Sequence, residues 1–160
     1  MKKIPLTRGY EAIVDDVDYP SVSQYKWHAV PKGPGLIYAV RESMHKKIYL
    51  HRDIMKPENN SQIVDHINHD CLDNRRENLR IVTPTQNQQN ARRHKAGTSK
   101  YKGVYWNKQL GKWEAKIRTP SGKRVRLGSY EEEEAAAAAY NRASEHYHGE
   151  YSCVESLANA

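Results

Sequence analysis

Short runs in which apolar and polar residues alternate dominate the first 60 residues. They read "YEAIVDD" at 10–16, "LIYAVRE" at 36–42 and "KKIYLHR" at 46–52, and "PKGPG" and "KPENN" separate them. Alternation with a period of two predicts strands with one buried face, and Pro and Gly between the runs predict turns. We therefore expect a small β-rich region over residues 1–60 that supports the segment after it.

Residues 61–93 have a different pattern. "QIVDH" at 62–66 and "NLRIVT" at 78–83 predict two strands, and the polar "INHDCLDNRRE" predicts the loop that joins them. Thr83-Pro84-Thr85-Gln86 has the form of a capping box with Pro at the first helical position, which predicts a helix through "TQNQQNARR". Strand, loop, strand and helix together form a ββα unit.

After a basic connector at 94–99, residues 100–150 predict a second unit. Its three strands are "YKGVYW", "KWEAKIRT" and "KRVRLGSY", with a tight hairpin at "PSG". "SYEEEEAAAAAYNRASEHYHG" predicts a helix that Ser129 caps and Gly149 ends. The expected fold class is α+β: a ββα unit with an N-terminal β region, then a three-stranded antiparallel sheet packed on one helix.

The charge distribution separates the second unit into two parts. The net charge of the chain is +7. Residues 98–128 hold nine Lys or Arg against one acidic residue, a net +8, while residues 129–160 hold one Arg against seven acidic residues, a net −6. The basic part predicts a surface that binds nucleic acid.

Other features exclude several classes of protein. Cys71 and Cys153 are far apart and have no C-x-x-C partner, and the N-terminus lacks the apolar run of a signal peptide. No stretch approaches the roughly 20 apolar residues of a membrane span. We expect a protein without disulfides or membrane segments, in the cytoplasm.

One face of the predicted three-stranded sheet is basic or polar. Period-two alternation places Lys116 and Arg118 opposite to Ala115 and Ile117. A twisted basic sheet can enter the major groove of DNA, where Arg and Lys bind guanine edges and phosphates. A merely solvated face is the alternative, but such a face normally mixes the two signs of charge.

Residues 99–150 closely resemble the APETALA-two/ethylene-response-factor DNA-binding domain through "KYKGVYW", "GKWEAKIR", "KRVRLGSY" and "EEAAAAAYNRA". The resemblance implies that the sheet reads the major groove of double-stranded DNA. The implied contacts are Lys102, Tyr105, Asn107, Lys116, Arg118, Arg124 and Arg126. Tyr105, Lys116 and Arg126 stand where Arg, Glu and Trp are usual, so the plant target sequence does not transfer.

The ββα unit offers a metal site and a base. Asp65 at a strand end and Asn87 on a helix could supply oxygen ligands, which suit a hard cation such as Mg²⁺. His66 could take a proton from water, since its ordinary pKa of about 6.5 lies close to working pH. Successive strand residues point to opposite faces, so the strand must end or bulge at Asp65 if both side chains serve one site.

Residues 49–90 resemble the HNH nucleases, in particular the homing endonucleases of phages and bacteria, through "YLHRDIM", "VDHINHDCLDNRRENLRIVT" and "QNQQN". The resemblance implies DNA phosphodiester hydrolysis in a bacterial or phage-infected cell. It makes Asp65 and Asn87 ligands of a divalent metal, Mg²⁺ or alternatively Mn²⁺. The same resemblance implies that His66 is the general base and that Asn78 orients its ring. Residues 1–50 resemble a segment that often precedes this nuclease.

Several residues have two interpretations. His51 lines the site, contacts phosphate or, as we favour, has a structural or accessory role. Arg75, Arg76 and Arg80 are either solvated or bind phosphate, while Asp73 and Asn74 are interpreted as turn formers. His66, His69 and Cys71, with His51, form a weaker candidate zinc site, because their spacing is irregular and no second cysteine pair is present.

Two functions are consistent with these residues. The first is a metal-dependent DNA endonuclease with a separate DNA-binding domain, which as a monomer with one centre should nick one strand. The second is a DNA-binding transcriptional regulator whose nuclease-like part is only a scaffold. We favour the first because Asp65, His66, Asn78 and Asn87 are all present.

Overall fold

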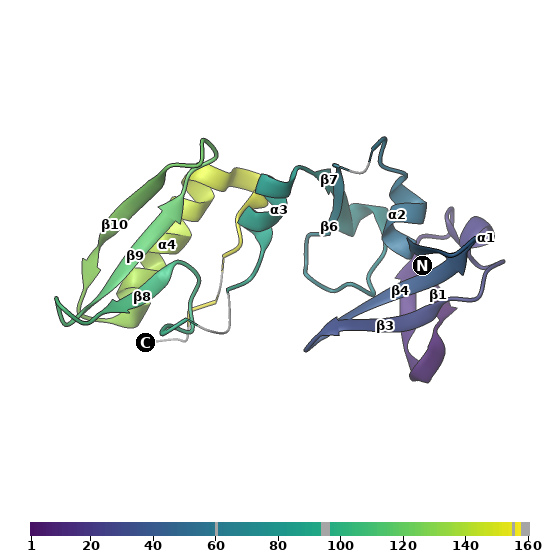
Figure 1. Cartoon of the computed structure of the whole chain (residues 1–160), viewed down its shortest axis with the longest axis horizontal. Helices are drawn as coiled ribbons and strands as arrows, with labels where there is room; N and C mark the ends of the chain where they lie inside the picture. Colours follow the sequence, from purple (N-terminus) through teal and green to yellow (C-terminus); the bar gives the residue numbers. More distant parts are fainter. Residues whose placement is uncertain (60, 94–96, 155, 158–160) are drawn as a thin grey trace. The chain divides into compact units, whose positions relative to one another are not determined.

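The structure is a computed structural model that describes residues 1–59, 61–93, 97–154 and 156–157. The chain forms two compact units, Met1–Pro84 and Thr85–Ala160. Small antiparallel sheets and a few helices make up both units, a mixed α and β architecture (Figure 1). Residues 94–96 of the expected connector lie outside the described residues.

The first unit contains three antiparallel sheets. β1 (Lys2–Pro5) pairs with β2 (Glu11–Val14), and β6 (Ile63–His66) pairs with β7 (Leu79–Val82). The third sheet has the order β3-β4-β5, formed by β3 (His28–Gly33), β4 (Leu36–Ser43) and β5 (Lys46–Tyr49). Two 3₁₀ turns, η1 (Thr7–Gly9) and η2 (Arg76–Asn78), and the short helix α1 (Tyr19–Val22) lie between strands.

The helices α1 and α2 (Leu50–Met55) of this unit were not predicted from the sequence. The run "KKIYLHR" is a strand only as far as Tyr49 and continues as α2. Leu50, His51 and Ile54 are buried, a helical spacing that places one face of α2 in the core. Because the run is so short, its alternation did not distinguish the strand from the helix that follows.

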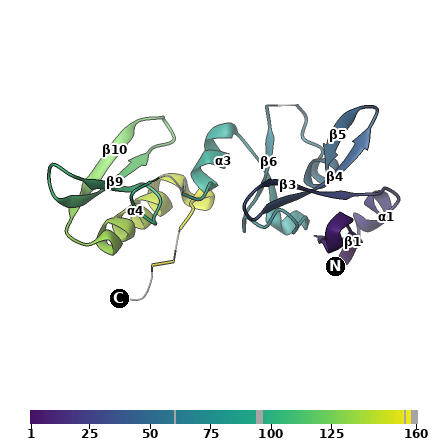
Figure 2. The same ribbon diagram turned by 60° about the horizontal axis from the view of Figure 1, so that its bottom comes forward.

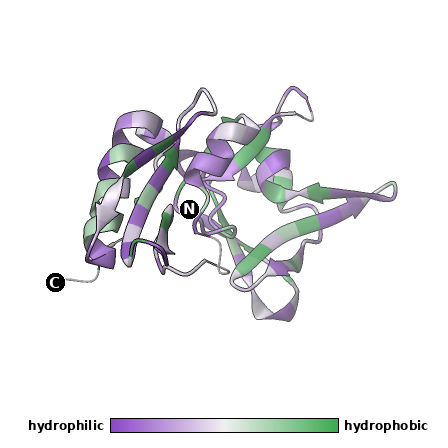
Figure 3. Cartoon of the chain, turned by 60° about the vertical axis from the view of Figure 1, so that its left-hand side comes forward, coloured by the Kyte–Doolittle hydropathy of each residue, from purple (hydrophilic) through white to green (hydrophobic). Residues whose placement is uncertain are grey.

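The second unit has the predicted strands and helix. β8 (Val104–Asn107), β9 (Lys112–Arg118) and β10 (Arg124–Tyr130) form an antiparallel sheet in the order β10-β9-β8. The long helix α4 (Glu133–His148) lies along one face of it (Figure 2). Hydrophobic and hydrophilic residues alternate along these strands (Figure 3). α3 (Pro84–Asn90) precedes the sheet, and η3 (Gly149–Tyr151) follows α4.

Three helix boundaries can be compared with the sequence analysis. Gly149 ends α4 with a φ of 52°, as predicted. Ser129 does not cap α4, because β10 stays paired with β9 as far as Tyr130 and the helix begins only at Glu133. α3 begins at Pro84 as predicted but ends at Asn90, before the end of the expected run.

Close packing between α4 and the sheet requires a glycine in the second unit. Gly103 has a φ of +70°, and a Cβ atom there would lie 2.1 Å from the Tyr140 ring and 2.7 Å from the carbonyl oxygen of Lys116. Gly103→Ala combines left-handed backbone strain with overpacking, so we expect it to lower the free energy of unfolding by at least ~3 kcal/mol. Denaturant unfolding of the full chain, followed by tryptophan fluorescence, measures this loss.

Gly122 provides the matched control for this substitution. Its φ is +85°, but a Cβ atom there would meet nothing within 4 Å. Gly122→Ala should therefore lose only the backbone contribution, roughly 1–2 kcal/mol. Equal losses at the two positions would show that the predicted clash with Tyr140 is absent.

Candidate active site and nucleic-acid interface

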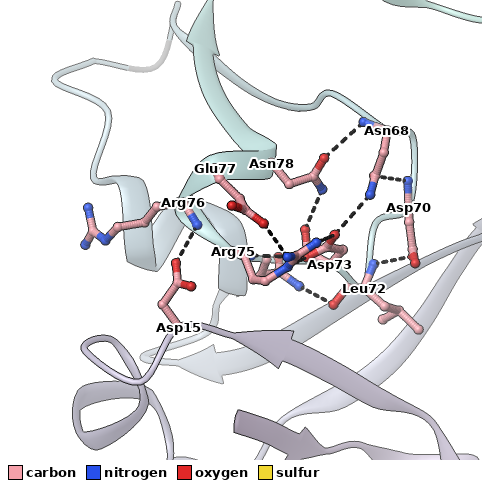
Figure 4. Close-up of polar contacts among 10 residues, drawn as sticks. Asp15, Asn68, Asp70, Leu72, Asp73, Arg75, Arg76, Glu77 and Asn78 are labelled. Atoms are coloured by element: carbon pink, nitrogen blue, oxygen red, sulfur yellow. Dashed lines mark hydrogen bonds and ion pairs between the residues drawn. The ribbon is translucent and has the colours of Figure 1, made fainter. Parts of the chain in front are cut away.

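Side-chain amides and carboxylates fold the polar loop between β6 and β7 (Figure 4). Asn68 Oδ1 accepts a hydrogen bond from the Asp70 backbone at 2.8 Å, and Asp70 Oδ1 accepts one from the Leu72 backbone at 2.9 Å. Asn78 Oδ1 accepts from the Asn68 backbone at 3.0 Å, and its Nδ2 donates to the Asp73 carbonyl at 2.8 Å. The loop that follows His66 is thus held by its own side chains.

Asn74 lies beside the His66 ring. Asn74 Oδ1 is 3.4 Å from His66 Nε2, and its Nδ2 donates to the Leu72 carbonyl at 3.0 Å. The two hydrogen bonds of the Asn78 side chain described above join the two ends of the loop. Asn74 is only 1% exposed. Its hydrogen bond to the Leu72 carbonyl agrees with the turn-forming role expected from the sequence, and its contact with His66 is an additional one.

His66 is a buried imidazole at the end of β6. Its ring centre lies 5.0 Å from that of His51 and 6.2 Å from that of Tyr38. Burial lowers the pKa of His66 below its ordinary value, although the Asn74 hydrogen bond and the charge of Asp65 act in the opposite direction. The neutral form, which can accept a proton, is therefore favoured near neutral pH.

His51 packs against the same ring from α2. The rings of Tyr38 and Tyr49 also contact the His51 ring, and their centres lie 5.6 and 5.5 Å from its centre. Burial first, and then the neighbouring His66, lower the pKa of His51 to about 3. A neutral, buried His51 is consistent with the structural or accessory role that the sequence analysis favoured.

Asp65 contacts an arginine on the neighbouring strand. Asp65 and Arg80 are direct partners in the β6–β7 ladder, and Asp65 Oδ2 is 3.0 Å from Arg80 Nη2. β6 continues through His66 without a register shift, so the expected end or bulge at Asp65 is not found. The regular ladder directs Asp65 and His66 to alternate faces of β6, although Asp65 is near enough for its charge to act on the imidazole.

The other two arginines of this segment also pair with carboxylates. Arg75 Nη2 is 2.8 Å from Asp73 Oδ2, and Arg76 donates to both oxygens of Asp18 at 2.7 and 2.8 Å. Arg76 joins positions 58 residues apart in the sequence. These pairs give Arg75 and Arg76 a structural role in holding the loop, in addition to the phosphate contact considered above.

Asn87 lies half-buried on α3, which belongs to the second unit from Thr85 onward.

The structure also bears on the alternative zinc site at His66, His69, Cys71 and His51. Among the described residues, no group of three or more His, Cys, Asp or Glu side chains is placed to hold a metal ion. His66, His69, Cys71 and His51 therefore do not form the candidate zinc site.

The face of the β8–β10 sheet opposite to α4 carries the predicted cations. Ala115, Ile117 and Val125 pack toward α4, and alternation directs their neighbours to the other face. Arg118 is paired directly with Arg124, and Lys116 with Arg126. Like charges directly opposite each other on a sheet are destabilising. The exposed cations of this face are Lys116, Arg118, Arg124 and Arg126.

Three predicted DNA contacts have further partners within the second unit. The Tyr105 hydroxyl donates to Glu114, and Asn107 Oδ1 accepts from two backbone amides of its own turn. Lys102 Nζ donates to the carbonyl oxygens of Gln88 and Gln89, at 3.3 and 2.6 Å. These carbonyls belong to the last turn of α3, where a cation is favourable.

Comparisons with known proteins match both parts of the chain. The family model described as "HNH endonuclease" matches residues 57–89, and the model described as "AP2 domain" matches residues 99–150. An uncharacterized HNH endonuclease of Acanthamoeba polyphaga mimivirus is 33% identical over 152 residues, which cover 94% of this chain and 77% of the relative. This match spans both units.

Two further relatives match smaller parts. An ethylene-responsive transcription factor of Arabidopsis thaliana is 46% identical over 54 residues, 33% of this chain and 13% of that protein. Protein 3.8 of Escherichia phage T7 is 32% identical over 88 residues, 55% of this chain and 71% of the relative. No solved structure matches the chain significantly. Within the described part of the chain, no helix is long and apolar enough to span a membrane.

Proposed function

The chain belongs to the HNH endonuclease family, and on this premise we propose that it hydrolyses DNA phosphodiester bonds with a divalent metal ion. The first unit supplies the general base, and the sheet of the second unit binds double-stranded DNA. The observation that carries the proposal is the buried His66 imidazole at the end of β6, with Asn74 beside it in a loop of hydrogen-bonded side chains.

The chemistry of the donor set fits a hard cation. We propose that Asp65 and Asn87 hold Mg²⁺, or alternatively Mn²⁺, through a carboxylate and an amide oxygen, the ligand types that these ions prefer. When bound, the ion supplies positive charge that stabilises the phosphate and the leaving oxygen. Arg80 orients the Asp65 carboxylate from the neighbouring strand.

His66 is the proposed general base, and Asn74 fixes which nitrogen acts. Since the Asn74 amide nitrogen donates to the Leu72 carbonyl, its oxygen faces His66 Nε2 and accepts a hydrogen bond from it. That arrangement places the proton of the neutral ring on Nε2, so Nδ1 accepts the proton of water. The water oxygen then bonds to phosphorus as one ester P–O bond breaks.

The second unit is proposed to select the DNA. Its open sheet face brings Arg118 opposite Arg124, a pair that repels until an anion lies between its members, and it presents Lys116 and Arg126 as further exposed cations. The DNA backbone is such an anion, and a sheet can reach base edges in the major groove. We assign base or phosphate contacts to Lys102, Tyr105, Asn107, Lys116, Arg118, Arg124 and Arg126.

Replacing Arg118 tests this role. If Arg118 reads a base, Arg118→Ala should weaken binding to the preferred sequence by ~1–3 kcal/mol and relax the preference at one position. Arg142, exposed on α4, is the control, because α4 covers the other face of the sheet and Arg142→Ala removes the same charge away from the open face. Binding titrations on duplexes with single base changes measure the affinity and the base preference of both variants. Equal weakening on all sequences would make Arg118 a phosphate contact only.

We propose that the protein acts as a monomer and nicks one strand, because one chain provides one set of reactive groups. We also propose that it acts on DNA in the cytoplasm of a bacterial or phage-infected cell. The alternative is a DNA-binding regulator with an inactive nuclease-like scaffold. The AP2-like segment is compatible with both functions, whereas the His66 environment is required only by a nuclease.

A further inference from the structure

Glu114 is the single acidic residue among residues 98–128. It lies in the middle strand β9, between Trp113 and Ala115, both of which pack toward α4. Alternation therefore directs Glu114 to the open, basic face. It is nevertheless only 4% exposed. Other side chains of this face must cover the carboxylate.

The carboxylate joins all three strands of the sheet. Tyr105, directly opposite on β8, donates its hydroxyl hydrogen to Glu114 Oε2. Ser129, directly opposite on β10, has its Oγ 3.5 Å from Glu114 Oε1. One side chain thus connects β8 and β10 across the centre of the open face.

Two of the proposed DNA-contacting cations bind the same carboxylate. Arg126 Nη2 is 2.6 Å from Glu114 Oε1, and Lys116 Nζ is 3.3 Å from Oε2. The Lys116 ammonium also lies 4.5 Å from the centre of the Tyr105 ring. The side chains of Arg126 and Lys116 are still 53% and 44% exposed. Glu114 therefore holds the charged group of each side chain, and both side chains remain accessible to a ligand.

A β-bulge helps to set the direction of Arg126. The register of β10 against β9 shifts between Arg126 and Gly128. Gly128 has a φ of +143°, and a Cβ atom there would lie 2.9 Å from the Tyr130 hydroxyl. Bulges of this kind redirect a side chain. Arg126 also donates to Ser129 Oγ at 2.7 Å, so two side chains, Ser129 and Glu114, fix the orientation of its guanidinium.

A carboxylate in this position opposes general attraction to DNA. The hydrogen bond from Tyr105, and then those from Lys116 and Asn107, hold the pKa of Glu114 at about 2, so it is charged at working pH. Its negative charge lowers the positive potential that attracts phosphates. A contribution to affinity therefore does not explain it, whereas fixing the orientation of neighbouring cations does.

We propose that Glu114 is a positioning residue for DNA sequence selection. It holds Arg126, Lys116 and Tyr105 in one arrangement on the open sheet face, which increases discrimination among base sequences and weakens binding to DNA in general. The inference rests on the proposed DNA-binding role of this sheet. It adds a determinant of specificity that itself need not touch a base.

The test uses the full chain without divalent metal, so that DNA is bound but not cut. A random-sequence duplex library is first selected on the wild type, and dissociation constants are then measured for the enriched duplex and a scrambled one over a range of salt. Glu114→Gln should bind the scrambled duplex several-fold tighter, with a salt slope steeper by up to ~0.9. The ratio of the two constants should fall about tenfold.

Two variants separate positioning from charge. Glu131, whose side chain is 73% exposed and pairs with Lys112 at 2.8 Å, is the matched control. Glu131→Gln should tighten binding to both duplexes and leave their ratio unchanged. Ser129→Ala removes the hydrogen bonds of Ser129 with Glu114 and Arg126 without changing the charge, and Ser129 has no assigned DNA contact, so it should lower the ratio and leave the salt slope unchanged. It also decides the question if Glu114→Gln does not fold.

The outcomes distinguish the inference from the function on which it rests. If the wild type enriches no sequence, the proposed role of the sheet in DNA selection is wrong. If the wild type enriches a sequence but Glu114→Gln and Ser129→Ala both keep its ratio, DNA selection stands and the positioning role of Glu114 is overturned. Thermal unfolding of each variant confirms that the folded protein was measured.

Discussion

His66→Ala is expected to lower the rate of DNA cleavage by about 10²-fold or more, the usual scale for loss of a general base. The variant removes the buried imidazole whose neutral form is favoured at the end of β6. DNA affinity should change little, because the proposed DNA-binding cations lie in the second unit. Single-turnover cleavage and a parallel binding titration on one duplex measure the two effects separately.

His28 provides the control for this variant. It is an exposed histidine on β3 in the same unit, so His28→Ala should cleave at close to the wild-type rate. Asn74→Ala should reproduce part of the loss, since it removes the acceptor beside His66 Nε2. Near-normal cleavage by His66→Ala would remove this residue from the mechanism.

Asp65→Ala and Asn87→Ala are each expected to abolish Mg²⁺-dependent cleavage. Mg²⁺ is held by few protein oxygens, so the loss of one cannot be replaced from solvent in the same geometry. Cleavage is measured over a wide range of Mg²⁺ and Mn²⁺ concentrations. Full activity of either variant at the wild-type Mg²⁺ requirement would place the ion elsewhere.

Asp65 also forms an ion pair with Arg80, and the loss of that pair must be separated from the loss of a ligand. Asp53 and Arg41 form a comparable pair in the same unit, 3.1 Å apart and also partly buried. Asp53→Asn should lower stability to a degree similar to Asp65→Asn but leave cleavage intact. Thermal unfolding and cleavage of both variants distinguish the two roles.

The second unit could be predicted almost completely from the sequence because its signals are local. Alternation marked β9 and β10, the turn residues marked the hairpins, and Gly149 marked the end of α4. Ser129 was misassigned because a serine before a run of glutamates resembles a helix cap. Its pairing with Glu114 across the sheet is a long-range contact that the local sequence does not reveal.

The first unit contains contacts that could not be predicted from the local sequence. The strand at Asp65-His66 and its partner β7 were predicted, but the ion pairs of Asp65 with Arg80 and Asp18 with Arg76 depend on tertiary structure. Asn74 and Asn78 have the same chemistry and similar spacing from His66. Both are buried, so only the geometry of their contacts shows that Asn74 faces the ring while Asn78 joins the ends of the loop.

A plasmid cleavage assay tests the central claim, DNA hydrolysis by the centre at His66, most directly. Supercoiled plasmid carrying the duplex sequence selected by the wild type is incubated with the full chain and Mg²⁺, beside His66→Ala and a reaction with chelator. We predict that the wild type converts supercoiled DNA to nicked circles before any linear molecules form, while both controls leave it supercoiled. Binding without any strand cleavage in Mg²⁺ or Mn²⁺, or equal cleavage by His66→Ala, would contradict this account.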